Sequence, residues 1–156
     1  MKEVTGNLVT MAESGLLEVI VQGCNCYCTM GKGIAKQIRE TFPAAYSADR
    51  DTIPGDYNKL GTISYAIMRG GSLIVVNAYT QYDFWVPGQP SDQVFVDYDA
   101  VRMCFRKIKH IWAGSGRRFG IPLIGAGLAH GDWSIISKII ETEMAGEDLT
   151  LVHFGG

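Results

Sequence analysis

The sequence lacks the features that mark membrane proteins and nucleic-acid-binding proteins. Its 14 basic and 16 acidic side chains are scattered over 156 residues, and the formal net charge is −2. No basic stripe is available to bind a phosphate backbone by charge, so we expect no general nucleic-acid binding. The N-terminal MKEVTGNLVT (1–10) lacks the apolar run of a signal peptide, and no apolar segment approaches the ~20 residues that span a bilayer. We therefore expect a cytoplasmic protein that does not bind membranes.

The sequence also lacks the cysteine spacing of a zinc site. In a cytoplasmic protein, the four cysteines are expected to be reduced rather than paired. Cys24, Cys26 and Cys28 alternate with single residues, whereas zinc sites use more widely spaced pairs and a fourth ligand. We predict that these cysteines fill space beneath a crowded loop, and that the protein needs neither a metal nor a cofactor.

What the sequence does contain is enough apolar residues for one sizeable core, at 47%. The length fits a single domain over 1–156. Hydrophobic patterns predict strands at 16–23, 61–68, 72–80, 119–125 and 149–154, and helices at 33–42, 94–112 and 133–144, the last capped by Asp132. The second and third strands should form a hairpin through the RGG turn. This alternation predicts an α/β fold with a mostly parallel sheet covered by helices on both faces.

Two turns of this fold share the pattern apolar-Gly-x-Gly-apolar-Ala, MGKGIA at 30–35 and IGAGLA at 124–129. Residues without a Cβ atom let backbone N–H groups converge on an anion, and a following helix adds a partial charge of roughly +0.5 at its N-terminus. Ligands of such sheets bind at the carboxyl ends of the strands. Two such turns at neighbouring strand ends can hold a diphosphate between them. The alternative is that each turn only permits close helix–strand packing.

The sequence matches neither of the two common phosphate-binding motifs. A Walker loop would need Gly at Cys26 and Ser or Thr at Gly33, and a dinucleotide fingerprint would need Gly or Ala at Lys36 and at His130. We therefore expect a phosphate-bearing ligand that is held in another way. The carboxamide of Asn25 both donates and accepts, which suits a ribose hydroxyl or a positioned water; the alternative is an asparagine that stabilises its own turn.

Two long motifs, GCNCYCTMGKGIAKQIRETFPAAY (23–46) and IPLIGAGLAHGDW (121–133), together resemble the macrodomain family. The resemblance is to the branch that contains ADP-ribose 1″-phosphate phosphatases and related bacterial and phage proteins, and it runs from VTGNLVT (4–10) to LTLVHF (149–154). It implies a three-layer α/β/α sandwich with a mixed, mostly parallel sheet. It also implies that the partner is ADP-ribose or an ADP-ribose derivative, either free or on an ADP-ribosylated macromolecule.

The resemblance implies a role for each part of the site. Asn7 stands where many macrodomains have an aspartate, and its amide oxygen would accept from the adenine amine without charge assistance. Phe154 would lie near the adenine face and Asn25 at the distal ribose, while the two glycine turns would enclose the diphosphate. The residues predicted to contact the ligand are Gly6, Asn7, Leu8, Gln22, Cys24, Asn25, Gly31, Lys32, Gly33, Ile34, Ala35, Ile124, Gly125, Ala126, Gly127, Leu128, Ala129 and Phe154.

Hydrolysis of the ligand would depend on further residues. The phosphatase-like branch commonly has a histidine where this sequence has Gln22, and glutamine cannot exchange a proton near neutral pH. Relatives that use a lysine and an aspartate would need them in YTQYDFW (79–85) and at Ala129, where neither occurs.

The remaining catalytic candidates are Asn25, His130 and Asp132. His130 can act as general base toward a water held by Asn25, whereas Asp132 either assists it or only caps the following helix. Two functions stay open within the family, hydrolysis of an ADP-ribose phosphate or ester and non-catalytic recognition of ADP-ribose. A nucleotide-phosphate binder outside the family is the third alternative. Whether 79–90 closes over the site as a lid also stays open.

Overall fold

The structure is a computed structural model that describes residues 1–90 and 92–155. One six-stranded sheet has the order β1-β6-β5-β2-β4-β3. β3 runs antiparallel to β4, whereas the other neighbouring strands are parallel. The strands are β1 (Lys2–Gly6), β2 (Val19–Cys24), β3 (Ile63–Met68), β4 (Leu73–Tyr79), β5 (Arg118–Ile121) and β6 (Asp148–Phe154). The predicted hairpin and the predicted mixed, mostly parallel sheet are confirmed.

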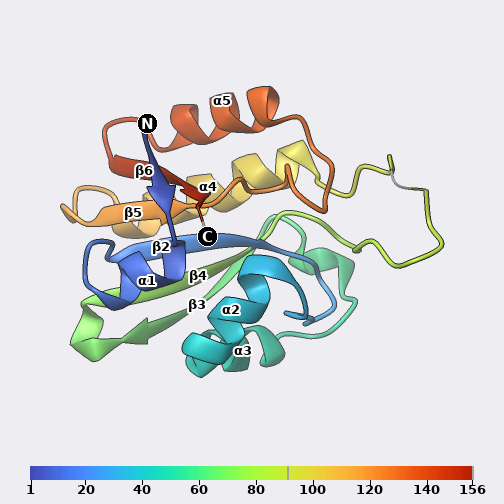
Figure 1. The fold of residues 1–156 in the computed structure, drawn as a ribbon, viewed down its shortest axis with the longest axis horizontal. Helices are drawn as coiled ribbons and strands as arrows, with labels where there is room; N and C mark the ends of the chain where they lie inside the picture. The colour runs from blue at the N-terminus through green and yellow to red at the C-terminus, as the bar shows by residue number, and fades with distance from the viewer. Residues whose placement is uncertain (91, 156) are drawn as a thin grey trace.

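Helices cover both faces of this sheet, as Figure 1 shows. They are α1 (Leu8–Glu13), α2 (Gly33–Thr41), α3 (Pro43–Arg50), α4 (Tyr98–Trp112) and α5 (Trp133–Glu143), with short 3₁₀ turns η1 (Tyr57–Lys59) and η2 (Arg69–Gly71). α4 and α5 pack on one face, and α1, α2 and α3 pack on the other. The three-layer α/β/α sandwich is therefore confirmed.

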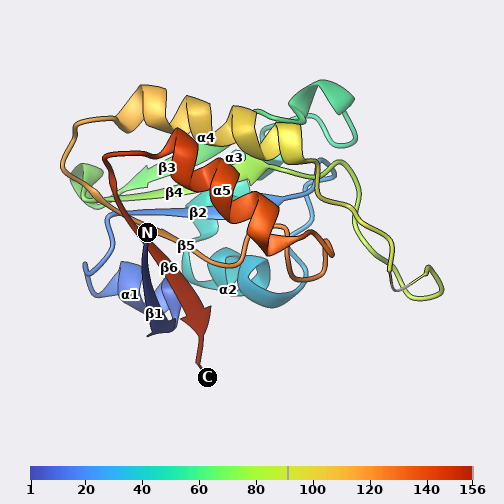
Figure 2. The ribbon, with the colours of Figure 1, turned by 90° about the horizontal axis from the view of Figure 1, so that it is seen from above.

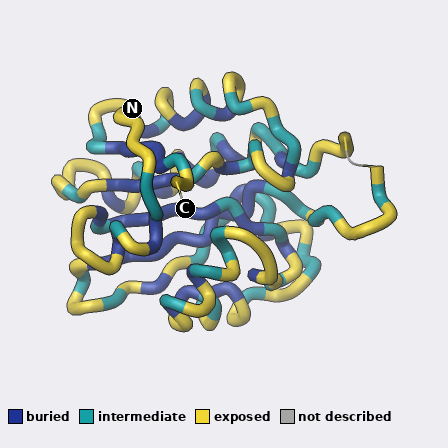
Figure 3. The backbone as a smooth tube through the Cα atoms, in the orientation of Figure 1, coloured by how far each residue is buried: buried dark blue, intermediate teal, exposed yellow. Residues whose placement is uncertain are grey.

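The core lies on both sides of the central strands. Val19 and Val21 of β2 pack beneath α4 and α5, while Ile20 between them packs beneath α1 to α3, because successive side chains of a strand point to opposite faces. All seven residues of β4 are buried. Figure 3 shows the burial concentrated along these strands, with exposed residues on the outer helices and loops. None of the helices in the described ranges has the length and hydrophobicity needed to cross a membrane.

The helix boundaries follow from side-chain caps. The Asp97 carboxylate accepts from the N–H of Ala100 at 2.9 Å, so α4 begins at Tyr98 rather than at Val94, where its apolar pattern begins. Asp132 accepts from the N–H of Ser134 at 2.9 Å and caps α5, as the sequence predicts.

Three elements have no clear signal in the sequence. β1 is an exposed edge strand with the polar sequence KEVTG. α1 has six residues and is too short for a periodic pattern. α3 follows α2 almost directly, with Pro43 at its first position, where proline is favoured.

Candidate functional site

The two glycine turns face one cleft at the carboxyl ends of the strands. β2 and β5 are parallel neighbours, so the turns that follow them leave the same edge of the sheet side by side. Between them lies a cleft of about 610 Å³. Its walls come from the turns after β2, β4 and β5, and consist of Gly23, Cys24, Asn25, Thr29, Gly31, Lys32, Gly33, Ile34, Ala35, Gln81, Phe84, Trp85, Val86, Pro87, Pro122, Leu123, Ile124, Gly125, Gly127, Leu128 and Ala129.

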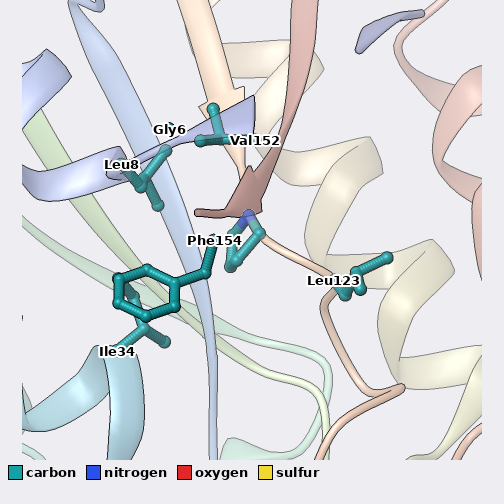
Figure 4. Close-up of a pocket in the computed structure, with 7 residues that line it drawn as sticks. Gly6, Leu8, Ile34, Leu123, Val152 and Phe154 are labelled. Carbon is teal, nitrogen blue, oxygen red and sulfur yellow. The ribbon is translucent and has the colours of Figure 1, made fainter. Parts of the chain in front are cut away.

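A second cavity of about 210 Å³ adjoins the cleft at the ends of β1 and β6. Figure 4 shows its lining, which is apolar apart from the backbone and comprises Gly6, Leu8, Ile34, Pro122, Leu123, Val152 and Phe154. Ile34, Pro122 and Leu123 line both spaces, so the cavity and the cleft form one continuous groove. Phe154 is 67% exposed as a residue, and its ring is available to stack on a planar ligand.

The first glycine turn presents free backbone to the cleft. A Cβ atom at Gly31 or Gly33 would have no other atom within 4 Å, and Gly33 has a left-handed φ of 56°. α2 begins at Gly33, and no side chain caps its N-terminus. Because Gly33, Ile34 and Ala35 all line the cleft, the N–H groups of the first helical turn lie along it.

The second turn combines a packed glycine with an open one. Gly125 has a φ of 73°, and a Cβ there would lie 2.6 Å from the Val96 side chain. Gly127 lines the cleft and, like Gly31, would have no atom within 4 Å of an added Cβ. Ala126 between them packs against the core under α4 and α5 and is not among the described lining residues, so its predicted ligand contact stays a prediction.

The cleft is weakly positive. Among the described lining residues, Lys32 is the one side chain with a formal charge at neutral pH, and its Nζ atom lies 5.4 Å from the centroid of the Trp85 ring. Burial raises the pKa of the Cys24 thiol well above its usual value, so this thiol stays neutral. An anion in the cleft would therefore meet one cation, backbone N–H groups and no carboxylate.

Asn25 lies on the cleft wall but is engaged in its own turn. Its Oδ1 atom accepts from the N–H of Tyr27 at 2.8 Å, and its Nδ2 atom donates to Thr29 Oγ1 at 2.7 Å. This is the turn-stabilising alternative. Asn7 behaves similarly at the other end of the groove, where it accepts from the N–H of Thr10 at 3.0 Å and caps α1. It does not line the described adjoining cavity.

Gln22 lies beneath the cleft rather than on its wall, which corrects its predicted ligand contact. It has no exposed surface, and its Nε2 atom donates to Asn77 Oδ1 at 2.9 Å. Gln22 is the last residue before the cleft-lining Gly23, and it points to the opposite face of the sheet.

His130 and Asp132 do not line the cleft either. His130 has a left-handed φ of 56°, and its Nδ1 atom donates to the Gln93 carbonyl at 2.9 Å. Asp132 accepts from the backbone and the hydroxyl of Ser134, and these hydrogen bonds lower the pKa of its carboxyl. Both side chains therefore lie off the described cleft wall, and the role of His130 as a base toward a water at Asn25 stays a prediction.

One wall of the cleft is not predicted from the sequence motifs. Gln81 and 84–87, in the turn after β4, form its far end. The Trp85 Nε1 atom donates to the Gln89 carbonyl at 3.3 Å, which holds the turn together. Figures 1 and 2 both show this yellow-green segment extending from the body of the molecule beyond the sheet edge. The feature of the sequence that could have indicated this wall is the cluster of aromatic residues directly after a predicted strand.

The cysteines have packing roles beneath the first turn. Cys24 and Cys26 are buried in a cluster with Met30 and Tyr79, as predicted. Burial raises the pKa of Cys26 to about 11. In residues 1–90 and 92–155, no three His, Cys, Asp or Glu side chains lie close enough to hold a metal ion.

A chain of buried hydrogen bonds crosses the sheet under α3. Gln22 donates to Asn77, Asn77 donates to Ser64 Oγ at 3.1 Å, and Ser64 contacts the Tyr79 hydroxyl at 2.8 Å. Tyr79 in turn donates to Asp49 Oδ1 at 2.7 Å. Asp49 is 1% exposed, and burial raises the pKa of its carboxyl against the opposing effects of Tyr79 and Lys59.

This raised pKa predicts a specific pH dependence of stability. Above the usual value of 3.8 and up to the raised pKa, the folded state binds more protons than the unfolded state, so the free energy of unfolding falls as pH rises through that window. Asp49→Asn removes this titration and keeps an oxygen for the Tyr79 hydroxyl. We expect the melting temperature of the unmodified protein to fall relative to that of Asp49→Asn as pH rises from 3.8 through the raised pKa of Asp49. Parallel melting curves across this range would contradict the assignment.

Comparison with solved structures identifies the fold. No protein-family model matches the chain. The macrodomain of DarG from Thermus aquaticus superposes with a TM-score of 0.71 at 20% identity, covering 99% of this chain and 97% of that one. DarTG from Thermosipho africanus in complex with ADP-ribose gives 0.68 at 16% identity, over 92% of this chain and 39% of that one. A Trypanosoma brucei macrodomain in complex with ADP-ribose gives 0.60 at 17% identity, over 98% and 63%. The protein has the macrodomain fold.

Its family follows from a sequence relative. The uncharacterized 17.5 kDa protein of the tk-vs intergenic region of Enterobacteria phage T4 is 31% identical over 159 residues, which cover 99% of this chain and 96% of the phage protein. The chain belongs to the family of this phage protein.

Proposed function

We propose that this protein binds ADP-ribose along the groove, with the adenine in the cavity at β1 and β6, the diphosphate between the two glycine turns, and the distal ribose beside Asn25. The observation that carries the proposal is the continuity of the groove from an apolar cavity to a weakly positive cleft. The ADP-ribose complexes of proteins with the same fold support it.

The chemistry of each part matches a part of the ligand. The apolar cavity with the Phe154 ring suits a planar base. The uncapped N-terminus of α2, the open glycines and Lys32 suit a diphosphate, since N–H dipoles and a cation both stabilise negative charge. Asn7 and Asn25 contribute by shaping the turns at the two ends, because their carboxamides already bond to backbone or side-chain groups nearby.

The residues of the groove favour recognition over hydrolysis. Hydrolysis of an ADP-ribose phosphate or ester would need a group that exchanges a proton at the distal ribose. His130 is bonded to the Gln93 carbonyl, Asp132 caps α5, and the Cys24 thiol is neutral. We infer a module that reads ADP-ribose, free or attached to a macromolecule, and does not turn it over.

Calorimetric titration with ADP-ribose tests the binding claim. We expect one-to-one binding in the micromolar range, about −7 to −8 kcal/mol. AMP, which lacks the second phosphate and the distal ribose, should bind about tenfold more weakly or worse, because it fills only part of the groove. The absence of heat at millimolar ADP-ribose would refute the proposal. Phosphate release from ADP-ribose 1″-phosphate that is lost in His130→Ala would restore the hydrolase assignment.

A further inference from the structure

Lys59 is a buried lysine with no role in the site described so far. It ends η1, between α3 and β3, and is 7% exposed. Within the described residues, no carboxylate lies at ion-pair distance from it, which is unusual because a buried ammonium group has lost its water. Its Nζ atom instead donates to the Cys26 carbonyl at 2.9 Å, and lies 3.4 Å from Cys28 Sγ and 4.7 Å from the centroid of the Tyr79 ring.

The contacts with Cys26 and Cys28 are made to the Asn25 turn, which we define as residues 24–30. The Cys26 carbonyl also accepts from the N–H of Gly55 at 2.7 Å, and the Cys26 N–H donates to the Tyr82 carbonyl at 2.9 Å. Cys28 has a left-handed φ of 60°, which is unfavourable for a residue with a side chain. Lys59 therefore reaches across from η1 to the residue after Asn25 and to the strained residue beyond it.

The side-chain bonds of Asn25 itself are local. Asn25 bonds to Tyr27 and Thr29 within the turn, and these contacts set its internal shape but not its position relative to the sheet. Its position depends on the backbone bonds of Cys26 and on the Lys59 ammonium. Side-chain bonds also hold it, from Cys26 to the Gln81 carbonyl, from Tyr27 to the Tyr82 hydroxyl and from Cys28 to the Asp49 carbonyl. Lys59 bonds to the turn at two residues, Cys26 and Cys28, and a substitution of this one side chain removes both bonds.

We propose that Lys59 is a positioning residue that holds the Asn25 turn in the shape that receives the distal ribose; this inference rests on the proposed function. Without the ammonium group, the Cys26 carbonyl keeps one donor, from Gly55, and Cys28 keeps only the bonds of its thiol to Asp49 and Thr52. The turn then samples other conformations, and the affinity for ADP-ribose falls in proportion to the fraction of molecules whose turn is in place.

The test compares Lys59→Met with Lys109→Met. Methionine keeps most of the length of lysine and removes the donor. Lys109 donates to the Ala145 carbonyl between α5 and β6, so it also holds a backbone carbonyl, but at the amino ends of the strands, away from the groove. We expect Lys59→Met to raise the dissociation constant for ADP-ribose about tenfold. Hydrogen–deuterium exchange should accelerate in 24–32 and stay unchanged in the central strands. Lys109→Met should alter neither readout.

Unchanged affinity for ADP-ribose in Lys59→Met would overturn the proposal. Faster hydrogen–deuterium exchange spread evenly over the sheet would also overturn it, because that result would mean that Lys59 stabilises the whole fold rather than the turn. Should the unmodified protein not bind ADP-ribose, the proposed function fails by itself, and exchange in 24–32 decides the role of Lys59 without any ligand. Lys59→Gln replaces Lys59→Met if the latter has no cooperative unfolding transition, because its nitrogen is one bond closer to the backbone and no longer reaches the Cys26 carbonyl. The same results support or overturn the proposal for that variant.

Discussion

Gly127→Glu is expected to weaken ADP-ribose binding by about 100-fold, equivalent to 2–3 kcal/mol. Gly127 lines the cleft in the second glycine turn, and an added Cβ atom meets no atom within 4 Å. The new carboxylate would face a diphosphate in a groove that otherwise presents N–H groups and Lys32. At an effective dielectric constant of about 20, two like charges about 4 Å apart repel by about 4 kcal/mol, and solvent in the open cleft reduces this figure.

Gly127→Gln is the matched control, since it has the same size without the charge. We expect it to lose less than about fivefold in affinity, because the site is open and only the backbone approach is crowded. Both variants should melt within about 2 °C of the unmodified protein, as expected for exposed substitutions. Calorimetry and thermal melts measure these quantities. Equal losses for both variants would mean obstruction rather than repulsion, and no loss in Gly127→Glu would place the diphosphate elsewhere.

Local patterns were sufficient for α2, α4 and α5. The apolar residues of α4 recur every three or four positions and are buried at Val101, Phe105, Ile108 and Trp112. β1 is different, because an edge strand whose residues remain exposed needs no apolar pattern. Its position beside β6 comes from the parallel pairing of distant segments, which no local pattern encodes.

The pattern of the two glycine turns is local in the sequence, whereas the surroundings of the catalytic candidates are not. Gly-x-Gly is a local requirement, and the placement of both turns at one sheet edge follows from α/β topology. The direction of the His130 ring depends instead on a left-handed backbone and on the Gln93 carbonyl, which lies 37 residues earlier in the chain. Asn25 had two interpretations in the sequence, and its bonds to Tyr27 and Thr29 support the turn-stabilising one.

The position of Gln22 in the sequence indicates that its side chain is buried. A central strand of a parallel sheet is covered on both faces, so a polar residue within VIVQGC is expected to find a buried partner rather than a ligand. That partner, Asn77, sits directly opposite on β4. Identifying Asn77 needs the register between two strands that lie about fifty residues apart, and this register is a property of the folded sheet.

Gly131→Ala is expected to cause the largest loss of stability, about 2–3 kcal/mol, or a fall in melting temperature of about 5–10 °C. A Cβ at this position would lie 2.6 Å from the Gly125 carbonyl oxygen and 2.8 Å from Ile136 Cδ1. The Gly131 N–H also donates to that same carbonyl and closes the second glycine turn. The end of a flexible side chain can move aside, but a backbone oxygen held by a hydrogen bond cannot. The turn itself must therefore open.

Opening of the turn links this loss of stability to the groove. Gly125 and Gly127 lie within the 125–131 segment that the bond closes, so Gly131→Ala should also weaken ADP-ribose binding in the fraction of the protein that remains folded. Gly127→Ala is the control in the same turn, and because its Cβ meets nothing within 4 Å we expect a change below about 0.5 kcal/mol. Urea unfolding measures the stabilities and calorimetry the affinities. If the two alanine variants were equally stable, the close contact at Gly131 would be one that the backbone relieves at little cost, and the closed second turn would not be needed for the fold.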